Sequence, residues 1–535
     1  MKQYQKHNRR WLTGALVSIL AGTIFGVVLQ FFKGKVLDCA AAGDVRHTIS
    51  YTGLLLGFIL CEVCGYFLYD RFSAKFVAGC TRELKQDVFA SIIKRSYVAY
   101  KNRPQGEYLA KYTNEVDTIK ERRFRMLPML WEILFKIILV SGALFLLDWR
   151  VAIVTIALLT TPLYVPKLIE NRLQDAQSSY LQAVEDNLTK VSDWLSGFEI
   201  IKNYSIEQKI LEKFEAVNGD TVEKLLKDTQ LGNLSRLITT LISYLSYFIV
   251  LMLSAWLVLR GDFSAGDFFV AIGMIDQLSY PLISLAGIIR QLIAVKPACA
   301  AMEDFLVADK GTQQSAALTE VREGITFQNV TFSYDGQRPI LDEFSFQIKK
   351  GQRYLLQGPS GCGKTTAVNL LLRYYDADSG GITIDGTPIE DYGSTYGCMT
   401  VVRQEAILFH DTLRNNLTMY QNIPDGKLLE VLRSVGLDRY ANLQALDGVL
   451  EEGGANFSGG EKKRICLARA LLRQTDVLIL DEPLANLDEA TADKVEDLLL
   501  SIAGKTLLIV SHQFSEGKLG AFDRVLNFAG KTAIQ

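Results

Sequence analysis

The segment GPSGCGKT, residues 358–365, has the form GxxxxGKT of a phosphate-binding loop. An apolar run, Tyr354-Leu355-Leu356, precedes it, and a helix-favouring run, residues 367–371, follows it. This is the strand–loop–helix context that the motif requires. Its glycines let backbone N–H groups approach phosphate oxygens, and the helix presents its positive end. Lys364 is placed to reach the β- and γ-phosphates of a nucleotide, and the Thr365 hydroxyl to ligate Mg²⁺.

A second apolar run, residues 477–480, ends in two neighbouring carboxylates, Asp481 and Glu482. Such pairs are usually surface charges, but a place at the end of a buried strand favours a catalytic role. In P-loop enzymes an acid at this point holds Mg²⁺, which is the role we predict for Asp481. Glu482 is then placed to accept a proton from a water that attacks the γ-phosphate.

The bulk composition points to a membrane protein of more than one domain. The chain has 535 residues, of which 49% are hydrophobic and 22% charged, with a mean hydropathy of +0.14. A chain of that length is too long to fold around a single hydrophobic core, so two or more domains are expected. A net charge of -2 indicates that no nucleic acid is a partner. Eight scattered cysteines do not suggest a disulfide scaffold, and four histidines leave little for a histidine-rich metal site.

The first half contains six segments that are long and apolar enough to cross a bilayer, which takes roughly 20 residues each. They are residues 11–32, 51–69, 127–147, 150–170, 235–259 and 267–290. The first could instead be a signal peptide, but its apolar run is long and lacks an evident small-residue cleavage site. We therefore predict a retained membrane helix.

Basic residues set the predicted orientation. They are frequent between residues 71 and 125, whereas the loop between the first two spans offers only Lys33, Lys35 and Arg46. By the positive-inside rule, the N-terminus, the long loops and the ATPase region are cytoplasmic, and the chain is a multi-pass protein of the cell membrane. We expect the two long loops to be helical excursions, each of about 30 residues reaching roughly 45 Å. Their predicted turning points lie near residues 106–109 and 197–201.

Charged residues within the predicted spans include Glu62, Glu132, Lys136 and Asp276. Such charges are costly in a bilayer and need partners or water. Glu132 and Lys136 are four residues apart, so they can pair on one helix face. These groups either line a polar translocation cavity or face another helix in structural pairs. The spacing of Cys61 and Cys64 resembles a redox or metal motif, but ordinary packing is expected inside a membrane helix.

The segment Phe457-Ser458-Gly459-Gly460-Glu461 resembles LSGGQ, the signature motif of ATP-binding cassette (ABC) ATPases. The resemblance covers residues 324–535 and gives further roles by position. Tyr334 resembles the aromatic residue that stacks on adenine, and Gln404 the glutamine that senses Mg²⁺ and water. His512 resembles the switch histidine. The resemblance implies an ATP site formed by Gly358, Ser360, Gly361, Cys362, Gly363, Lys364, Thr365 and Thr366 of one chain, with Asp488 of the D-loop, and with Ser458, Gly459 and Gly460 of a partner.

The implied fold is an α-helical six-span transmembrane domain of the ABC exporter type, followed by an α/β P-loop NTPase ABC domain. We expect the transmembrane domain at 1–302, a linker at 303–323 and the nucleotide-binding domain at 324–535. In this family one ATPase domain cannot complete an ATP site alone. The chain is therefore expected to work as a half-transporter that pairs with a second chain, identical or different, and uses ATP and Mg²⁺.

The substrate and the direction of transport stay open in the sequence. We expect an exporter of a peptide, lipid or drug-like compound. One alternative is an exporter-fold importer, for example of a metal–siderophore, and another is an ATP-gated channel or regulatory membrane protein. Phe457 and Glu461 depart from the usual leucine and glutamine of the signature motif, but the Ser-Gly-Gly contact is intact. No catalytic position is degenerate, so the chain is expected to hydrolyse ATP.

Overall fold

A computed structural model describes residues 1–161, 170–307, 318–334, 336, 338–359, 361–485 and 487–528. The chain divides into two compact units. The first, here called the membrane unit, comprises Met1–Ile93 and Pro104–Ala308. The second, the cassette unit, comprises Lys94–Arg103 and Asp309–Gln535. A ten-residue segment from the first half of the sequence thus belongs with the second half.

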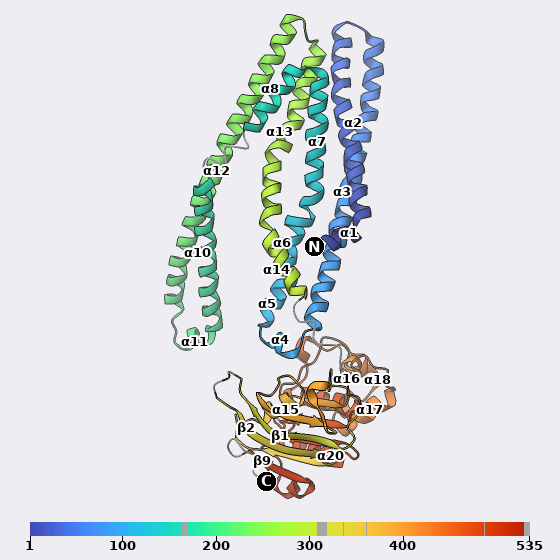
Figure 1. The fold of residues 1–535 in the computed structure, drawn as a ribbon, viewed down its shortest axis with the longest axis vertical. Coiled ribbons are helices and arrows are strands. Elements are labelled where there is room, and N and C mark those ends of the chain that lie inside the picture. Colours follow the sequence, from blue (N-terminus) through green and yellow to red (C-terminus); the bar gives the residue numbers. More distant parts are fainter. Residues whose placement is uncertain are drawn as a thin grey trace. The chain divides into compact units, whose positions relative to one another are not determined.

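All secondary structure in the described part of the membrane unit is helical (Figure 1). Its helices are α1 (Lys2–His7), α2 (Arg9–Ala41), α3 (Val45–Ile93), α5 (Gln105–Ala110), η1 (Lys111–Glu115), α6 (Val116–Ile119), η2 (Lys120–Phe124), α7 (Met126–Leu147), α8 (Trp149–Thr160), α10 (Glu170–Ser196), α11 (Phe198–Asn203), α12 (Glu207–Arg260), α13 (Ala265–Ala294) and α14 (Lys296–Val307). Here η1 and η2 are short π-helical segments that join α5, α6 and α7 into one long run.

Five helical runs among the described residues are long and apolar enough to cross a membrane. They are α2, α3, α5 through α7, α12, and α13 with α14. They coincide with five of the six predicted spans. The remaining prediction, residues 150–170, begins in the shorter apolar helix α8, while residues 162–169 lie outside the described residues. Membrane insertion of this fourth span therefore stays a prediction.

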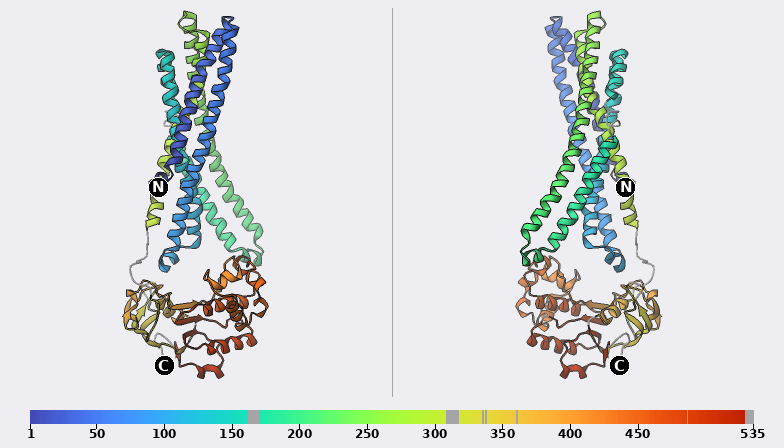
Figure 2. Two further views of the ribbon diagram at one scale, coloured as in Figure 1. Left: turned by 90° about the vertical axis from the view of Figure 1, so that its right-hand side faces the viewer. Right: turned by 90° about the vertical axis from the view of Figure 1, so that its left-hand side faces the viewer.

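The two long excursions turn at short helices, one of which is misplaced in the sequence prediction. The second excursion turns at Gly197 and α11, as predicted, and α10 and α12 run side by side from that turn (Figure 2). The prediction of a first turn at residues 106–109 is wrong, because those residues lie inside α5. The chain turns earlier, at α4 (Tyr97–Lys101), where Ser96 caps the helix and Pro104 delays the next one until Gln105.

Helix packing in the membrane unit depends on close approach at small residues and on a buried apolar centre. A Cβ atom added to Gly65 of α3 would lie 2.8 Å from the Gly22 Cα of α2, so these helices touch backbone to backbone. Buried side chains of α7, α8, α12 and α13 form one apolar cluster that includes Val140, Leu257 and Met274. This cluster holds together helices that are far apart in the sequence.

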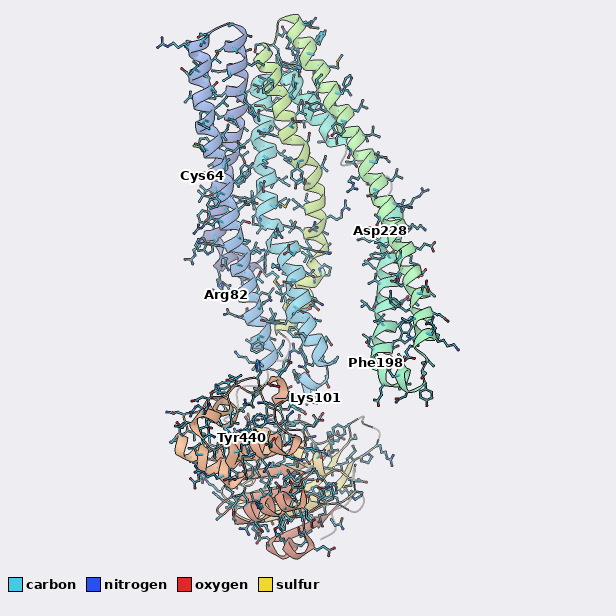
Figure 3. All side chains as sticks on the ribbon, turned by 180° about the vertical axis from the view of Figure 1, so that it is seen from behind. Cys64, Arg82, Lys101, Phe198, Asp228 and Tyr440 are labelled. Atoms are coloured by element: carbon cyan, nitrogen blue, oxygen red, sulfur yellow. The ribbon has the colours of Figure 1, made fainter. Side chains whose placement is uncertain are left out.

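The charges within the spans have different surroundings. Lys136 Nζ donates to Glu132 Oε1 at 3.0 Å, which confirms the predicted pairing. The Glu62 carboxylate faces α2, since a Cβ on Gly26 would meet Glu62 Oε1 at 2.7 Å. The Asp276 side chain is exposed on α13. Cys61 and Cys64 are both exposed on α3, where Figure 3 labels Cys64, so neither packs into the core of this chain.

The cassette unit contains two β-sheets. The antiparallel sheet has the strand order β2-β1-β4-β5, and the parallel sheet the order β6-β7-β8-β3-β9. The strands are β1 (Gly324–Phe332), β2 (Leu341–Lys349), β3 (Arg353–Gln357), β4 (Ser379–Ile384), β5 (Thr387–Pro388), β6 (Met399–Val402), β7 (Val477–Asp481), β8 (Thr506–Val510) and β9 (Arg524–Asn527). Strands β7 and β8 are completely buried, as near-continuous apolar runs in a parallel sheet should be.

Two apolar clusters lie on opposite faces of the parallel sheet. One packs α15 (Lys364–Leu371) and the antiparallel sheet against it, and the other packs the helices that follow β6. These elements are α16 (Leu413–Thr418), α17 (Asp425–Ser434), α18 (Leu443–Leu446), α19 (Gly459–Leu472) and α20 (Glu489–Ser501), with single turns η4 (Ile389–Asp391), η5 (Asp438–Tyr440), η6 (Glu452–Gly454) and η7 (Glu516–Ala521) elsewhere in the unit. The parallel strands therefore end at a fixed edge, where the predicted site residues gather.

Candidate nucleotide site

The phosphate loop leaves the end of β3 and enters α15. Gly358, Gly361 and Gly363 all have positive φ, at +147°, +80° and +105°. A Cβ atom at Gly358 would also lie 2.7 Å from the Phe528 carbonyl oxygen. Both the positive φ and this close contact therefore require glycine at position 358. Lys364 is buried, and its Nζ donates to the carbonyl oxygens of Gly358 and Pro359 at 2.7 and 2.9 Å. Lys364, the first residue of α15, thus reaches back to the start of the loop.

A cavity of about 780 Å³ opens over this loop. Its lining brings together eleven of the residues predicted for the site: Tyr334, Gly358, Gly361, Gly363, Lys364, Thr365, Thr366, Gln404, Asp481, Glu482 and His512. Tyr334 lies at the α15 side, with its hydroxyl 3.3 Å from Thr366 Oγ1. Ser360 lies outside the described residues. Cys362 contributes to the loop itself, where its Sγ accepts from Lys364 Nζ at 3.6 Å.

Asp481 ends β7 and is buried at the cavity. Burial raises the pKa of this carboxyl and the adjacent Glu482 adds to the effect, whereas Arg403, Lys364 and Lys463 oppose it. The nearest cation is Arg403, whose Nη1 lies 3.8 Å from Asp481 Oδ2. At 3.8 Å this ion pair is too long for a hydrogen bond, which spans about 2.7–3.2 Å between N and O.

Glu482 is held in a strained conformation that directs its carboxylate into the cavity. Its φ is +51°, which is uncommon for a residue with a side chain, and its N–H donates to the Val510 carbonyl at 2.8 Å. Glu482 Oε1 lies 2.8 Å from His512 Nδ1. Glu482 Oε2 is buried without a hydrogen-bond partner in the described part of the chain. A buried acceptor of this kind is ready to bind a water or a proton.

One group that the sequence reasoning passed over is Arg403, next to Gln404. Its Nη2 donates to Asn369 Oδ1 of α15 at 2.7 Å, and its guanidinium lies 5.3 Å from the centre of the Tyr374 ring. The Tyr374 ring also contacts α4, because Tyr97 stacks on it with ring centres 3.8 Å apart and planes 12° from parallel. Within the cassette unit, a line of contacts therefore leads from α4 to Asp481. Only the position of Arg403 beside a predicted site residue could have suggested it.

The signature segment does not reach this cavity. Ser458 caps α19, and its hydroxyl accepts from the Glu461 N–H at 3.2 Å while Glu461 Oε2 accepts from the Ser458 N–H at 2.8 Å. Asp488 caps α20 by accepting from the Thr491 N–H at 3.0 Å. The described lining of the cavity includes none of Ser458, Gly459, Gly460 or Asp488. One chain thus places the phosphate loop and the signature segment in separate places.

Comparison with known families decides the relationship. The family model of the ABC transporter transmembrane region matches residues 12–282, about half of the chain, and that of the ABC transporter ATPase matches residues 341–485. The chain belongs to the ABC transporter family. It is an exporter-fold half-transporter with both regions fused in one polypeptide, and an ATPase coupled to transport across a membrane.

Several relatives match along nearly the whole chain. The ATP-dependent lipid A-core flippase of Syntrophus aciditrophicus (strain SB) is 27% identical and is covered to 87%, with 96% of this chain aligned. The putative multidrug export ATP-binding/permease protein YgaD of Bacillus subtilis (strain 168) is 26% identical and covered to 92%, again with 96% of this chain aligned. Among solved structures, a bacterial Atm1-family ABC exporter with ATP bound matches with a TM-score of 0.78 at 22% identity, over 98% of this chain and 94% of that one.

Proposed function

We propose that this half-transporter exports an amphiphilic compound from the cytoplasm, using ATP that is bound between the cassette units of two chains. The observation that carries the proposal is the cavity over the phosphate loop, in which Lys364, Asp481, Glu482 and His512 converge. The names of relatives that export lipids and drugs support export over import or channel activity. The N-terminus and the cassette unit are then cytoplasmic, as the basic loops indicate.

ATP hydrolysis follows from the positions of three side chains. Lys364 and the backbone N–H groups that open α15 hold the phosphates and stabilise negative charge as it develops. The unpaired Glu482 Oε2 binds the attacking water and accepts its proton, since it is the buried acceptor without a partner at this edge. His512 fixes the orientation of that carboxylate through the 2.8 Å contact to Oε1.

The residues around the phosphate loop also fit a magnesium ion. Oxygen donors are what Mg²⁺ prefers, and Thr365, Gln404 and Asp481 present a hydroxyl, an amide and a buried carboxylate to the same cavity. These three residues would hold the ion, with Asp481 supplying the charge. When bound, Mg²⁺ neutralises phosphate charge and orients the phosphates.

A second chain is needed to complete each site. Ser458, Gly459 and Gly460 open α19 away from the cavity of their own chain, so a contact between this segment and a nucleotide is made across a dimer. Two chains then provide two ATP sites. An identical partner accounts for this, because the chain carries both an intact phosphate loop and an intact Ser-Gly-Gly segment.

Segment α4 is the element that couples the ATP site to the membrane helices. It is continuous in sequence with α3 on one side and α5 on the other, yet its Tyr97 stacks in the cassette unit. Through Tyr374 and Arg403, a shift of α4 changes the surroundings of Asp481. ATP binding and substrate binding can in this way bias the same equilibrium between inward-open and outward-open states.

The decisive experiment compares the wild type with Glu482→Gln in proteoliposomes. We expect Glu482→Gln to bind ATP as the wild type does but to lose hydrolysis by about 10²–10⁴-fold, because the general base is gone. Equal hydrolysis by both proteins would contradict the assigned base. Native mass spectrometry of the protein from its own host tests the dimer, where a mass near twice 59.7 kDa supports identical partners and a second polypeptide contradicts them.

A further inference from the structure

A second large cavity lies in the membrane unit, along α3. It measures about 910 Å³, and nine of its lining residues belong to α3 between Tyr69 and Lys85. They recur at spacings of three and four, so they form one face of the helix. The other lining residues belong to η2, α7 and the Arg125 between them, with Tyr280 of α13. We call this cavity the α3 groove. From Tyr69 to Lys85 it extends for about 24 Å, at a rise of about 1.5 Å per residue.

The middle of the α3 groove is open because the side chains there are small. Ala74 and Ala78 lie on the groove face and are exposed to it. Toward the Tyr69 end, the lining is mainly apolar and aromatic, with Met129 and Ile133 of α7 opposite Tyr69. An extended apolar chain fits such a lining, because it removes apolar surface from water along its length.

At the Lys85 end, α3 itself contributes two basic residues to the lining, Arg82 and Lys85. Lys120 and Arg125 line the groove from outside α3. Lys120 and Arg125 are already paired, because Lys120 Nζ lies 3.0 Å from Asp117 Oδ1 and Arg125 Nη1 lies 2.9 Å from Glu121 Oε2. Arg82 and Lys85 differ, since neither forms an ion pair with a carboxylate in the described part of the chain. Arg82 is exposed on this part of α3 (Figure 3), and Lys85 lies over the Tyr112 ring at 5.0 Å.

The carboxylates of the α3 groove add to the difference in charge between its two ends. Glu121 forms ion pairs with Lys120 and Arg125, and Glu132 forms an ion pair with Lys136 at 3.0 Å. The remaining acid, Asp70, lies next to Tyr69 at the far end. Among the described residues, the groove therefore has at one end two basic side chains without a carboxylate at ion-pair distance, and at the other end one such acid. An anionic head is attracted to the first end and repelled from the second.

We propose that the α3 groove binds an amphiphile with an anionic head group. The head lies against Arg82 and Lys85, as a phosphate or carboxylate does in charge-assisted hydrogen bonds, and the apolar part extends along Ala78 and Ala74 toward Tyr69. The role of this amphiphile as cargo rests on the proposed export function, but its binding does not. The inference thus narrows the open class of lipids, peptides and drugs to acidic amphiphiles.

Binding is tested on the full chain in nanodiscs of phosphatidylcholine, without nucleotide. The probe is dodecyl phosphate with a pyrene label at the chain end, and the matched probe carries a trimethylammonium head on the same chain. We expect the phosphate probe to bind at least about tenfold more tightly than the cationic one, which corresponds to one charge-assisted hydrogen bond. Equal affinity for the two probes would overturn the proposal.

Variants locate the bound head group. The double variant Arg82→Gln and Lys85→Gln is expected to weaken binding of the phosphate probe by about tenfold or more, and Arg82→Lys with wild-type Lys85 to retain most of it. Arg71→Gln removes a basic residue of α3 that does not line the groove and should bind as the wild type does. Ala78→Trp fills the exposed middle of the groove and should weaken both probes. Thermal unfolding checks that each variant is folded. Unchanged binding by the folded double variant or by Ala78→Trp would contradict the site.

Two further measurements identify the source of the bound head group and separate failure of the groove proposal from failure of the export proposal. Adding phosphatidylglycerol to the nanodiscs identifies the source of the head group, because competition with the probe assigns the groove to a bilayer lipid and lack of competition to a soluble amphiphile. A chain that binds the phosphate probe selectively but does not hydrolyse ATP would contradict the proposed export function and support the groove. A chain that hydrolyses ATP but does not distinguish the probes would contradict the groove alone.

Discussion

Two helices of the cassette unit, α15 and α19, both begin at glycine-rich segments, yet their N-termini have different surroundings. The N-terminus of α15 opens into a cavity together with Lys364. The N-terminus of α19 is closed on itself, because Ser458 and Glu461 exchange hydrogen bonds in a capping box. In the proposed function, the first is a phosphate site that one chain nearly completes. The second, whose N-terminal residues Ser458 and Gly459 are exposed, would contact a phosphate held by another chain.

The side-chain charge at the two helix N-termini also differs, and it favours phosphate binding at α15 over α19. Lys364 adds a positive charge at α15, whereas Glu461 adds a negative charge at α19. Partial burial opposes ionisation of Glu461, but hydrogen bonds from Ser458 and Tyr440 hold the pKa of its carboxyl below the ordinary value. The carboxylate is therefore charged at neutral pH and partly offsets the helix dipole. If both ends bind phosphate as proposed, the negative charge of Glu461 makes the α19 end the weaker of the two.

The largest loss of ATP hydrolysis is expected from a substitution at the start of α15. Replacing Lys364 with alanine removes the cation that spans the loop, so we expect hydrolysis to fall by about 10²–10³-fold and ATP binding to weaken. Steady-state hydrolysis and nucleotide binding measured on purified protein would show this. Lys462→Ala, at a half-buried lysine of α19 that does not line the cavity, is the matched control and should change neither quantity. Normal hydrolysis by Lys364→Ala would remove the distinction between the two helix ends.

A negative charge introduced at the N-terminus of α19 tests whether the two helix ends act on the same nucleotide within one chain. A Cβ atom at Gly459 meets nothing within 4 Å, and an acid in the first turn suits a helix, so Gly459→Asp should fold as the wild type does. We expect hydrolysis to fall by about a hundredfold because the new carboxylate repels the partner's nucleotide. ATP binding to the phosphate loop of the same chain should persist, unlike in Lys364→Ala. Loss of binding in Gly459→Asp would mean that the two helix ends meet within one chain.

The contacts of α4 predict a smaller effect. Tyr97→Ala removes the stack on Tyr374 and should reduce the stimulation of hydrolysis by a transported compound by about two- to tenfold, the range expected for one aromatic pair. Basal hydrolysis should change less than its stimulation, because no atom of α4 lines the ATP cavity. Tyr97→Phe keeps the ring and should behave as the wild type does. Equal stimulation of the alanine and phenylalanine variants would exclude this route of coupling.

The smallest effect is expected for Glu461→Gln. Glutamine preserves the capping hydrogen bonds but removes the negative charge, so the ATP concentration for half-maximal hydrolysis should fall by about two- to fivefold. The dependence of rate on ATP concentration measures this directly. Glu452→Gln removes a nearby exposed acid outside the capping box and serves as the control. An unchanged or higher half-maximal concentration in Glu461→Gln alone would contradict the electrostatic argument.

The cassette unit could be predicted from sequence more fully than the membrane unit. Motif order places Lys364, Asp481, Glu482 and His512 at the ends of parallel strands, and such ends share one edge of a sheet. Hydropathy likewise predicts the long helices. The separate positions of the Ser458 end and the phosphate loop match the expectation from family resemblance, although the roles of these residues remain proposals.

Features that depend on contacts between distant segments of the chain could not be predicted from the sequence. The first turn is at α4 rather than at residues 106–109, because the local caps Ser96 and Pro104 decide it and no hydropathy change marks them. The contact of Tyr97 with Tyr374 joins positions that are far apart in the chain. The α3 groove is likewise invisible in the sequence, since its charge polarity depends on which carboxylates are already paired.

The central claim, that each ATP site is formed by α15 of one chain and α19 of another, is tested most directly by mixing two inactive variants. Chains with Lys364→Ala and chains with Gly459→Asp are co-purified as heterodimers through different tags, and ATP hydrolysis is measured. The account predicts recovery well above either variant alone, because the intact α15 of the second chain meets the intact α19 of the first. Hydrolysis that stays at the level of the separate variants would contradict a site shared between chains.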